Sequence, residues 1–336
     1  MGARIVCFGE LLLRLSAPTG EVLLQSSRLD ARVAGAEANV AVSLARFGHR
    51  AEVVSRLPDD ALGRAARDEL RRHGVGVDHL TTGPGRMGLY FLTPGAVLRP
   101  SEVLYDRAGS AFALAEPDSY DWDALLDGAM WLHVSGVTPA LGRRAADSAL
   151  RAVRAARKRG VAVSFDGNYR AKLWAVWEGD APAILRELLA HADLAFVDDR
   201  DLALILGRSF DDADLRVRCR AAAAAAFDAF PQLQRIAATV RVQPGVAEQS
   251  LSALMFERGG AETEAGPHAL TGVVDRIGAG DAFAAGVLHG LIMGTPALPF
   301  GLAAAALKHS IVGDFNLVGV ADVQALVDGG GLDVRR

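Results

Sequence analysis

The order of apolar segments along the chain is the feature that most restricts its fold. Short, continuous apolar runs such as 131–135, 161–165 and 194–197 are typical of strands buried on both faces of a sheet. Segments with the apolar spacing of helices alternate with these runs, and several of them end at a glycine, such as Gly160. This alternation predicts an α/β domain with a mostly parallel central sheet and helices on its faces.

The individual elements follow from the same patterns. Strands are expected at 4–9, 51–55, 131–135, 161–165, 194–197, 236–242 and 251–256. Helices are expected at 36–47, 61–73, 141–159, 279–293, 301–312 and 321–328, and the alanine run 221–226 also lies in a helical pattern.

Two segments, 11–34 and 85–107, break the alternation. They contain strand-length runs punctuated by Pro and Gly, and neither carries a convincing helix. We expect them to form a small separate sheet over one end of a main domain that comprises 1–10, 35–84 and 108–336.

Composition argues against several classes of function. The chain has 336 residues, is 51% hydrophobic and carries a net charge of −4, so nothing favours binding to nucleic acid or to an anionic membrane. Cys7 and Cys219 are its only cysteines, which fits a reducing compartment. The N-terminus begins with a strand pattern in place of a signal peptide, and no apolar run is long enough to span a membrane. We therefore expect a cytoplasmic protein.

The segment 275–286, D-R-I-G-A-G-D-A-F-A-A-G, predicts a strand end, a glycine turn and the start of a helix. Gly278 and Gly280 have no Cβ, so backbone N–H groups can approach a ligand, and the helix dipole points to the same place. These features suit a phosphoryl group. Asp281 would repel that group, so we interpret it as a base that takes a proton from an attacking hydroxyl, the alternative being an ordinary first-turn acid.

Three other polar segments are candidates for a site. In 34–41, A-G-A-E-A-N-V-A, small residues enter a helix whose Asn39 could bind a substrate hydroxyl or belong to a well-packed helix start. The loop 166–174 follows a buried strand, the position at which open α/β sheets bind ligands. Arg107 and Arg170 come from different segments and hint at an acidic substrate, because arginine binds carboxylates with two parallel hydrogen bonds.

Two further segments have open interpretations. The carboxylates Asp198, Asp199 and Asp201 follow the strand 194–197, where they could bind magnesium through water or cap the next helix. In 308–316, a helix end is followed by Gly and Asp, and its Lys308 could merely complement the helix dipole.

Together, the segments 34–41 and 275–283 (D-x-x-G-A-G-D-A-F) resemble the two signatures of the ribokinase-like, or PfkB, family of sugar kinases, and the resemblance spans essentially the whole chain. The segments 105–107, 166–174 and 306–316 look like those of 2-keto-3-deoxygluconate kinases in particular. Those enzymes phosphorylate the primary hydroxyl of a six-carbon 2-keto-3-deoxy sugar acid with ATP and magnesium. The resemblance implies a three-layer α/β/α domain and a β-lid that covers the sugar and often joins two subunits, hence a homo-oligomer.

The resemblance also implies roles for individual residues. Asp281 matches the family's catalytic base, and Gly278, Ala279 and Gly280 match its anion hole. The positions that hold the keto acid are matched by Gly35, Tyr90, Tyr105, Arg107, Arg170 and Asp314, with Asn39 at a substrate hydroxyl. The nucleotide positions are matched by Asp198, Arg241, Gly278 and Gly280, and water-mediated magnesium binding is implied for Asp198 and Asp201.

The chain departs from the family pattern in three places. Asp198 and Asp201 replace Asn and Glu of an Asn-x-x-Glu motif linked to magnesium. Gly245, Ala247 and Gln249 stand where polar residues are common in the nucleotide segment, and Ala34 stands where many relatives have glycine. The first two departures lie in the segments implied to bind magnesium and the nucleotide, whereas the change at Ala34 is tolerable.

Other functions fit less well. A kinase for 2-keto-3-deoxygalactonate or for a neutral sugar such as fructose would use the same fold, but the arginines argue against the neutral sugar. A catalytically inactive interaction module is disfavoured by the intact Asp281 turn. A dinucleotide-dependent oxidoreductase is disfavoured because no G-x-G-x-x-G follows the first strand.

Overall fold

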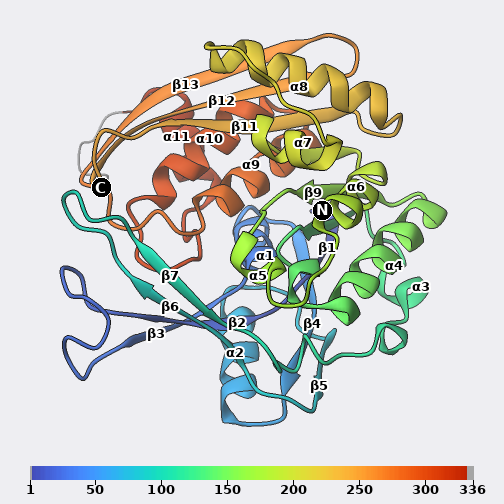
Figure 1. The fold of residues 1–336 in the computed structure, drawn as a ribbon, viewed down its shortest axis with the longest axis vertical. Helices are drawn as coiled ribbons and strands as arrows, with labels where there is room; N and C mark the ends of the chain where they lie inside the picture. Colours follow the sequence, from blue (N-terminus) through green and yellow to red (C-terminus); the bar gives the residue numbers. More distant parts are fainter. Residues whose placement is uncertain (1, 331–336) are drawn as a thin grey trace.

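The computed structural model describes residues 2–330 of the chain, and its strands form two sheets (Figure 1). The larger sheet has nine strands in the order β13-β12-β11-β10-β9-β8-β1-β4-β5, and the smaller has the order β3-β2-β6-β7. The strands are β1 (Arg4–Phe8), β2 (Leu12–Ser16), β3 (Asp30–Ala34), β4 (Arg50–Pro58), β5 (Leu80–Gly83), β6 (Gly88–Thr93), β7 (Glu102–Asp106), β8 (Trp131–Ser135), β9 (Ala162–Asp166), β10 (Leu194–Phe196), β11 (Arg235–Val242), β12 (Glu248–Glu257) and β13 (Glu262–Thr271).

Helices connect most of these strands. They are α1 (Ala36–Arg46), α2 (Ala61–Arg72), α3 (Trp122–Leu125), α4 (Arg143–Arg159), α5 (Ala171–Trp174), α6 (Ala181–Ala190), α7 (Asp199–Leu206), α8 (Leu215–Ala229), α9 (Ala279–Met293), α10 (Ala297–Lys308) and α11 (Val320–Val327). No helix within residues 2–330 is long and apolar enough to cross a membrane.

The predicted mostly parallel sheet is confirmed. The neighbouring strands from β5 to β11 all pair in parallel, and only the pairings of β12 with β11 and with β13, at one edge, are antiparallel. Because parallel strands share a direction, their carboxyl ends lie along one edge of the sheet, and the polar loops that follow them come together there.

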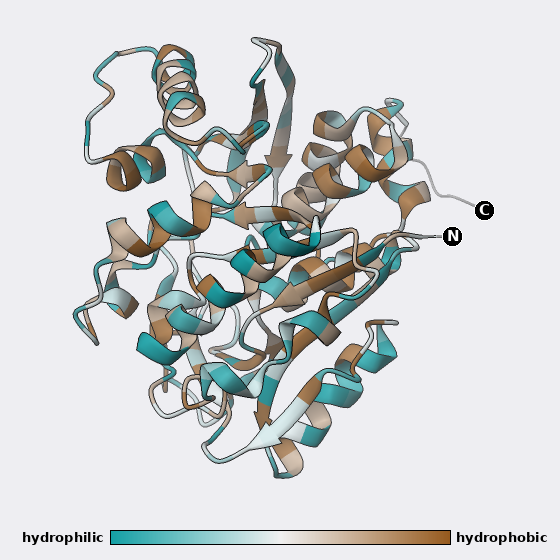
Figure 2. Cartoon of the chain, turned by 90° about the vertical axis from the view of Figure 1, so that its right-hand side faces the viewer, coloured by the Kyte–Doolittle hydropathy of each residue, from teal (hydrophilic) through white to brown (hydrophobic). Residues whose placement is uncertain are grey.

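The strand β1 shows how the sheet separates two layers of helices. Its alternate side chains point to opposite faces: Val6 and Phe8 pack in one hydrophobic cluster, and Ile5 and Cys7 pack in another. The first cluster includes residues of α3, α4, α6, α7 and α8, and the second includes residues of α1, α2, α9, α10 and α11. The three-layer α/β/α prediction is therefore confirmed. Figure 2 shows the same division, with largely brown central strands and helices that alternate between brown and teal.

The small separate sheet is also present, and its strands lie within the two segments predicted for it. β2 pairs antiparallel with β3 and parallel with β6, and β6 pairs antiparallel with β7. Figure 1 shows this sheet beside the carboxyl end of the central sheet. The exact domain boundaries and the action of this sheet as a lid stay predictions; residues 1 and 331–336 of the predicted main domain lie outside the described residues.

Some elements, such as β5 and α6, were not predicted, and two other differences from the expectation involve a proline. The helix predicted at 301–312 is α10, which begins and ends about one turn earlier, because Pro299 is tolerated in the first turn, where backbone N–H groups have no helical partner. The edge strand β13 was not predicted, because its sequence E-T-E-A-G-P-H-A-L-T is polar and contains Gly-Pro. An edge strand accepts Pro, since one side of its backbone faces away from the ladder.

Candidate active site

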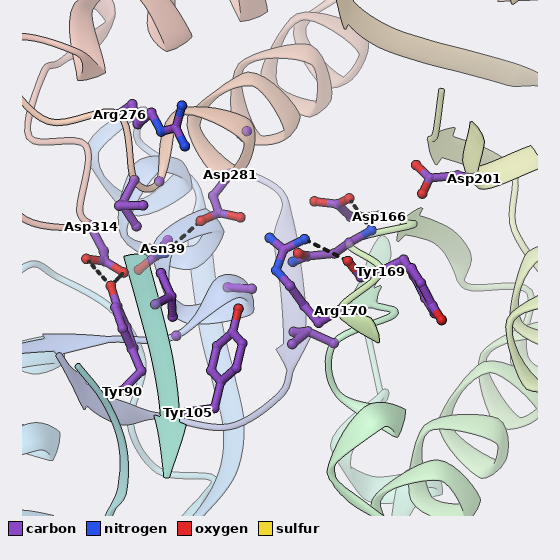
Figure 3. Close-up of a pocket in the computed structure, with 18 of the residues that line it drawn as sticks. Asn39, Tyr90, Tyr105, Asp166, Tyr169, Arg170, Asp201, Arg276, Asp281 and Asp314 are labelled. Carbon is purple, nitrogen blue, oxygen red and sulfur yellow. Dashed lines mark hydrogen bonds between the residues drawn. The ribbon is translucent and has the colours of Figure 1, made fainter. Parts of the chain in front are cut away.

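A cavity of about 860 Å³ opens at the carboxyl end of the central sheet, between the starts of α1 and α9 and the smaller sheet (Figure 3). Its lining includes thirteen of the residues predicted for the site: Gly35, Asn39, Tyr90, Tyr105, Arg107, Arg170, Asp198, Asp201, Arg241, Gly278, Gly280, Asp281 and Asp314. Ala279 is the predicted residue that does not line it, since it is buried in the turn. Residues far apart in the sequence thus form one site.

The glycine turn before α9 has the geometry of an anion site. Gly278 has a φ of 83°, and a Cβ there would lie 1.9 Å from the Asp314 carbonyl oxygen, so only glycine fits. The Ala279 N–H donates to the Arg276 carbonyl at 3.2 Å. Within residues 2–330, the N–H groups of Gly278, Gly280 and Asp281 have no such partner. These three groups, at the positive end of α9, are available to an anion.

Asp281 lies at this turn and contacts the start of α1. The Asn39 Nδ2 donates to the Asp281 Oδ2 at 2.6 Å. Burial raises the pKa of Asp281 to about 7, and the carboxylates of Asp314 and Glu37 add to the rise, while the hydrogen bond from Asn39 opposes it. A carboxylate with this pKa can accept a proton near neutral pH. The Asn39 Oδ1 is buried without a partner in the described part of the chain, so it can still accept a hydrogen bond.

Two more carboxylates, Asp166 and Asp201, face the cavity. Burial and the nearby charges of Asp281 and Asp201 raise the pKa of Asp166 to about 8. Burial and Asp198 raise the pKa of Asp201 to about 6. Such raised values indicate carboxylates that lack enough positive charge around them. Asp166 ends β9 and was recognised only as part of a polar loop, because its neighbours in the site come from distant segments.

Asp198 and Asp201 also cap α7, which was one of the two open interpretations. The Asp198 side chain accepts from the backbone N–H groups of Arg200 and Asp201, and the Asp201 Oδ2 accepts from the Asp198 N–H at 3.2 Å. The second Asp198 oxygen pairs with the Arg200 guanidinium at 2.6 Å. Asp198 therefore accepts hydrogen bonds at both of its carboxylate oxygens, whereas the Asp201 Oδ1 has no hydrogen-bond partner within residues 2–330. No group of three or more potential metal ligands occurs within residues 2–330.

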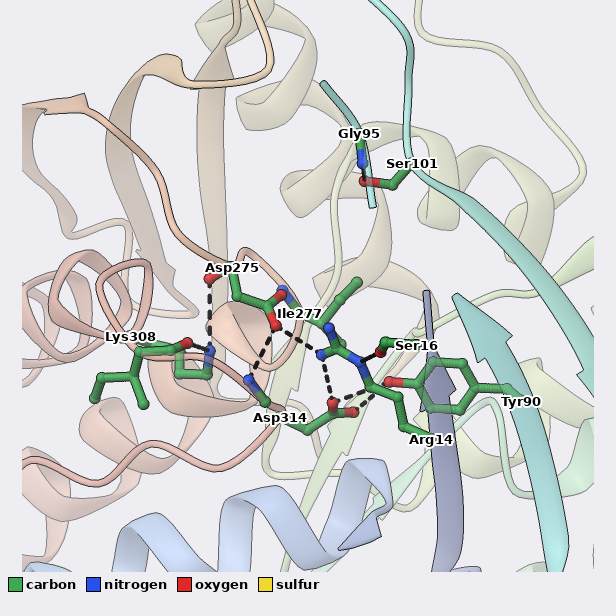
Figure 4. Close-up of polar contacts among 11 residues, drawn as sticks. Arg14, Ser16, Tyr90, Gly95, Ser101, Asp275, Ile277, Lys308 and Asp314 are labelled. Atoms are coloured by element: carbon green, nitrogen blue, oxygen red, sulfur yellow. Dashed lines mark hydrogen bonds and ion pairs between the residues drawn. The ribbon is translucent and has the colours of Figure 1, made fainter. Parts of the chain in front are cut away.

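Asp314 belongs to a buried network that links the two sheets (Figure 4). The Tyr90 hydroxyl donates to its carboxylate, with distances of 2.9 and 2.8 Å to the two oxygens. Arg14, on β2, bonds Asp314 at 3.0 Å and Asp275 at 2.7 Å. Asp275 in turn accepts from the Ile277 and Gly313 N–H groups, which fixes the glycine turn. Sequence reasoning missed Arg14, although a charged residue at a buried position of an alternating strand was a signal.

The two arginines predicted to bind an acid differ in their surroundings. The Arg107 Nε donates to the Glu10 Oε2 at 2.5 Å, and both side chains are almost fully buried. Arg170 is exposed and donates only to the Tyr169 carbonyl at 3.0 Å among residues 2–330. In Figure 3, Arg170 extends between Asp281 and Asp166. Arg170 thus carries an unpaired positive charge in the cavity.

A second cavity of about 670 Å³ adjoins the first, because Asp166, Asp198, Asp201, Arg241 and Gly280 line both. Arg241 and Arg276 both line the first cavity, and burial together with the charge of Arg276 lowers the pKa of Arg241. Neither has a carboxylate partner among residues 2–330, so this end of the site suits an anion with several charges.

Comparison with known proteins agrees with this geometry. Residues 3–314 match the family model described as pfkB family carbohydrate kinase. The chain is 35% identical to a 2-dehydro-3-deoxygalactonokinase of Haloferax volcanii over the full length of both, and 29% identical to a 2-dehydro-3-deoxygluconokinase of Bacillus subtilis over 93% of this chain and 91% of the relative.

Comparison with solved structures identifies relatives of the same kind. The crystal structure of a 2-dehydro-3-deoxygluconokinase from Thermotoga maritima superposes with a TM-score of 0.92 at 36% identity, over 97% of this chain and all of the other. The architecture is accordingly the ribokinase-like α/β fold with a second, smaller sheet. The chain belongs to the PfkB family of carbohydrate kinases, phosphotransferases with an alcohol group as acceptor.

Proposed function

We propose that this protein is an ATP-dependent kinase that phosphorylates the C6 hydroxyl of 2-keto-3-deoxygluconate to give 2-keto-3-deoxy-6-phosphogluconate. The observation that carries the proposal is the placement of Asp281 beside three unpartnered backbone N–H groups, in a cavity that also holds the unpaired Arg170. The turn suits a phosphoryl group, the carboxylate suits a hydroxyl, and the arginine suits an acid.

In the proposed reaction, the ionised Asp281 accepts the proton of the C6 hydroxyl as that oxygen attacks the γ-phosphorus of ATP. The bond between the γ-phosphorus and its bridging oxygen breaks, and ADP leaves with that oxygen. The N–H groups of Gly278, Gly280 and Asp281 would stabilise charge on the transferring group, because they lie at the positive end of α9 and have no other partner within residues 2–330.

Arg170 and Arg107 select the acid. Glu10 offsets the charge of Arg107, so Arg107 offers hydrogen-bond donors with little net charge. Arg170 has no such partner among residues 2–330 and supplies the main attraction for a substrate carboxylate. Tyr105, Gly35 and the Asn39 amide oxygen lie around the same cavity, where they would contact the rest of the sugar acid, while Tyr90 holds Asp314.

Magnesium fits one part of this site. Asp166 and the free oxygen of Asp201 are hard oxygen donors that lack sufficient positive charge, so a divalent cation would relieve their raised pKa values. We expect these two residues to hold the ion through water, with Asp198 shaping the loop. Magnesium bound there would neutralise charge on the nucleotide phosphates, and Arg241 and Arg276, which line the same cavity, would add positive charge.

The smaller sheet has two further proposed roles. As a lid formed by 11–34 and 85–107, it would exclude water that otherwise hydrolyses ATP. It also carries Leu104 on β7, which is 58% exposed, with Val97 and Leu98 exposed at its tip, so it offers an apolar surface for a homo-oligomer. We place this metabolic activity in the cytoplasm.

The nearest alternative is the C4 epimer, 2-keto-3-deoxygalactonate, which the name of the Haloferax relative favours. The deciding experiment offers both keto-deoxy acids, gluconate, fructose and ribose with ATP and magnesium, and identifies the phosphorylated carbon by NMR. The proposal expects turnover of a keto-deoxy acid at C6. Preferential turnover of fructose or ribose would refute it, and the absence of ATP turnover with every acceptor would favour an inactive relative.

A further inference from the structure

The buried pair of Glu10 and Arg107 lies where the chain passes between the two sheets. Glu10 follows β1 of the central sheet and precedes β2 of the smaller one, and Arg107 directly follows β7 on the return. The crossing between β3 and α1 also meets this point, since a Cβ at Gly35 would lie 2.4 Å from the Glu10 carbonyl oxygen. One ion pair therefore joins the chain segments at this junction.

In this ion pair, only one of the three guanidinium nitrogens of Arg107 forms a hydrogen bond. Its Nε donates to the Glu10 Oε2, and no atom within residues 2–330 bonds its two terminal nitrogens, while the residue lines the cavity. A planar guanidinium whose Nε is fixed cannot rotate freely about the bond to its side chain, so its terminal nitrogens keep one direction.

The Glu10 carboxylate is buried and has little space around it. Glu10 is 2% exposed, and a Cβ at Gly88, the first residue of β6, would lie 2.6 Å from its Oε1. That oxygen has no partner among the described residues. A buried acid in this position stabilises the fold little on its own, because its loss of hydration offsets much of the attraction to Arg107.

We propose that Glu10 is a positioning residue for substrate specificity: it holds the Arg107 guanidinium so that its terminal N–H groups face the carboxylate of the sugar acid. This inference rests on the proposed function, because it takes the acid as substrate. Glu10 does not touch the substrate and acts only through Arg107.

The test is a double-mutant cycle of Glu10→Gln and Arg107→Ala, read as KM and kcat for the keto-deoxy acid. Glu10→Gln keeps the size and one acceptor but removes the charge. We expect kcat/KM to fall about tenfold, as for the loss of a charged hydrogen bond, mainly through KM. In the Arg107→Ala background the same change should have less than about a twofold effect, because its target is gone.

Glu52→Gln is a matched control. Glu52 is a similarly buried acid that pairs with Arg4 at 2.6 Å, at the opposite end of β1. Both glutamine variants should lower the melting temperature, but only Glu10→Gln should raise KM. If neither Glu10→Gln nor Glu10→Asp folds, Arg107→Lys is measured by itself: it keeps the charge but cannot make the Nε contact with Glu10, and it should raise KM while kcat stays unchanged.

Three outcomes would overturn the proposal: an equal effect of Glu10→Gln in both backgrounds, an unchanged KM, or tighter binding. Tighter binding is a real alternative, because the variant also removes a negative charge that repels the substrate carboxylate. The substrate comparison separates the two claims. If the unmodified protein prefers a neutral sugar, the proposed function fails; if it prefers the acid and the cycle shows no coupling, only the role of Glu10 fails.

Discussion

Arg170→Met is expected to convert the site from one that prefers an acid to one with little preference. Arg170 is exposed in the cavity, and its only partner within residues 2–330 is a backbone carbonyl, so a substrate carboxylate can bind it without breaking an ion pair. At about 4 Å and an effective dielectric constant of about 20, the attraction is about 4 kcal/mol. Losing a charged hydrogen bond costs about 1.5–3 kcal/mol.

These values bracket a loss of about 2–4 kcal/mol in transition-state binding, which corresponds to a fall of about 30- to 1000-fold in kcat/KM. The fall should apply to the keto-deoxy acid, whereas any turnover of fructose should change less than about threefold. Arg170 also lowers the pKa values of Asp281 and Asp166, so its removal raises both. The assay is therefore run at pH 9, where Asp281 stays ionised in either protein.

Lys172→Met is the matched control. Lys172 is an exposed cation two residues further along, outside the cavity lining, so its removal changes net charge without changing the site. Its kcat/KM should stay within about twofold of the unmodified protein. Equal losses for acid and neutral sugar in Arg170→Met, or retention of more than a third of the acid activity, would refute the carboxylate role.

Three further outcomes follow from the site. Asp281 acts as a base only when it is ionised, and burial raises its pKa to about 7. We therefore expect kcat/KM to be independent of pH above about pH 7 and to fall tenfold per pH unit below it. A flat profile between pH 5 and 8 contradicts the assignment of Asp281 as the base. Asn39→Leu removes a donor to the ionised form, so the apparent pKa should rise by about one unit, and an unchanged or lower pKa contradicts this. Excess EDTA should stop turnover, which added magnesium restores; undiminished turnover in EDTA excludes a required divalent metal.

The sequence predicts well those features of the fold and the site that are encoded by neighbouring residues. The glycine turn at 278–280 and Asp281 lie within one helical turn of each other, so their spacing alone indicates an anion site with a carboxylate. The parallel sheet follows from runs of five or so apolar residues, whose burial on both faces is a local pattern.

The parts that sequence does not predict depend on pairing between distant segments. The contact between Arg14 and Asp314 joins residues 300 positions apart, and nothing local to either residue indicates the other. Asp166 was recognised only as part of a polar loop for the same reason, since its pKa is raised by burial in the folded protein and by the charges of the distant residues Asp281 and Asp201. The one-turn error in α10 has a different cause: Pro299 looks like a helix stop, but it lies in the first turn.

The central claim, that Asp281 deprotonates the acceptor hydroxyl in a sugar-acid kinase, is tested most directly by single-turnover phosphoryl transfer in Asp281→Asn. The change is nearly isosteric, and it removes the negative charge of the carboxylate together with its ability to accept the proton. We expect the transfer rate to fall by about 10²–10⁴-fold at pH 8, while the Kd for ATP stays within about threefold and the protein remains folded. Retention of a tenth or more of the rate would contradict the account.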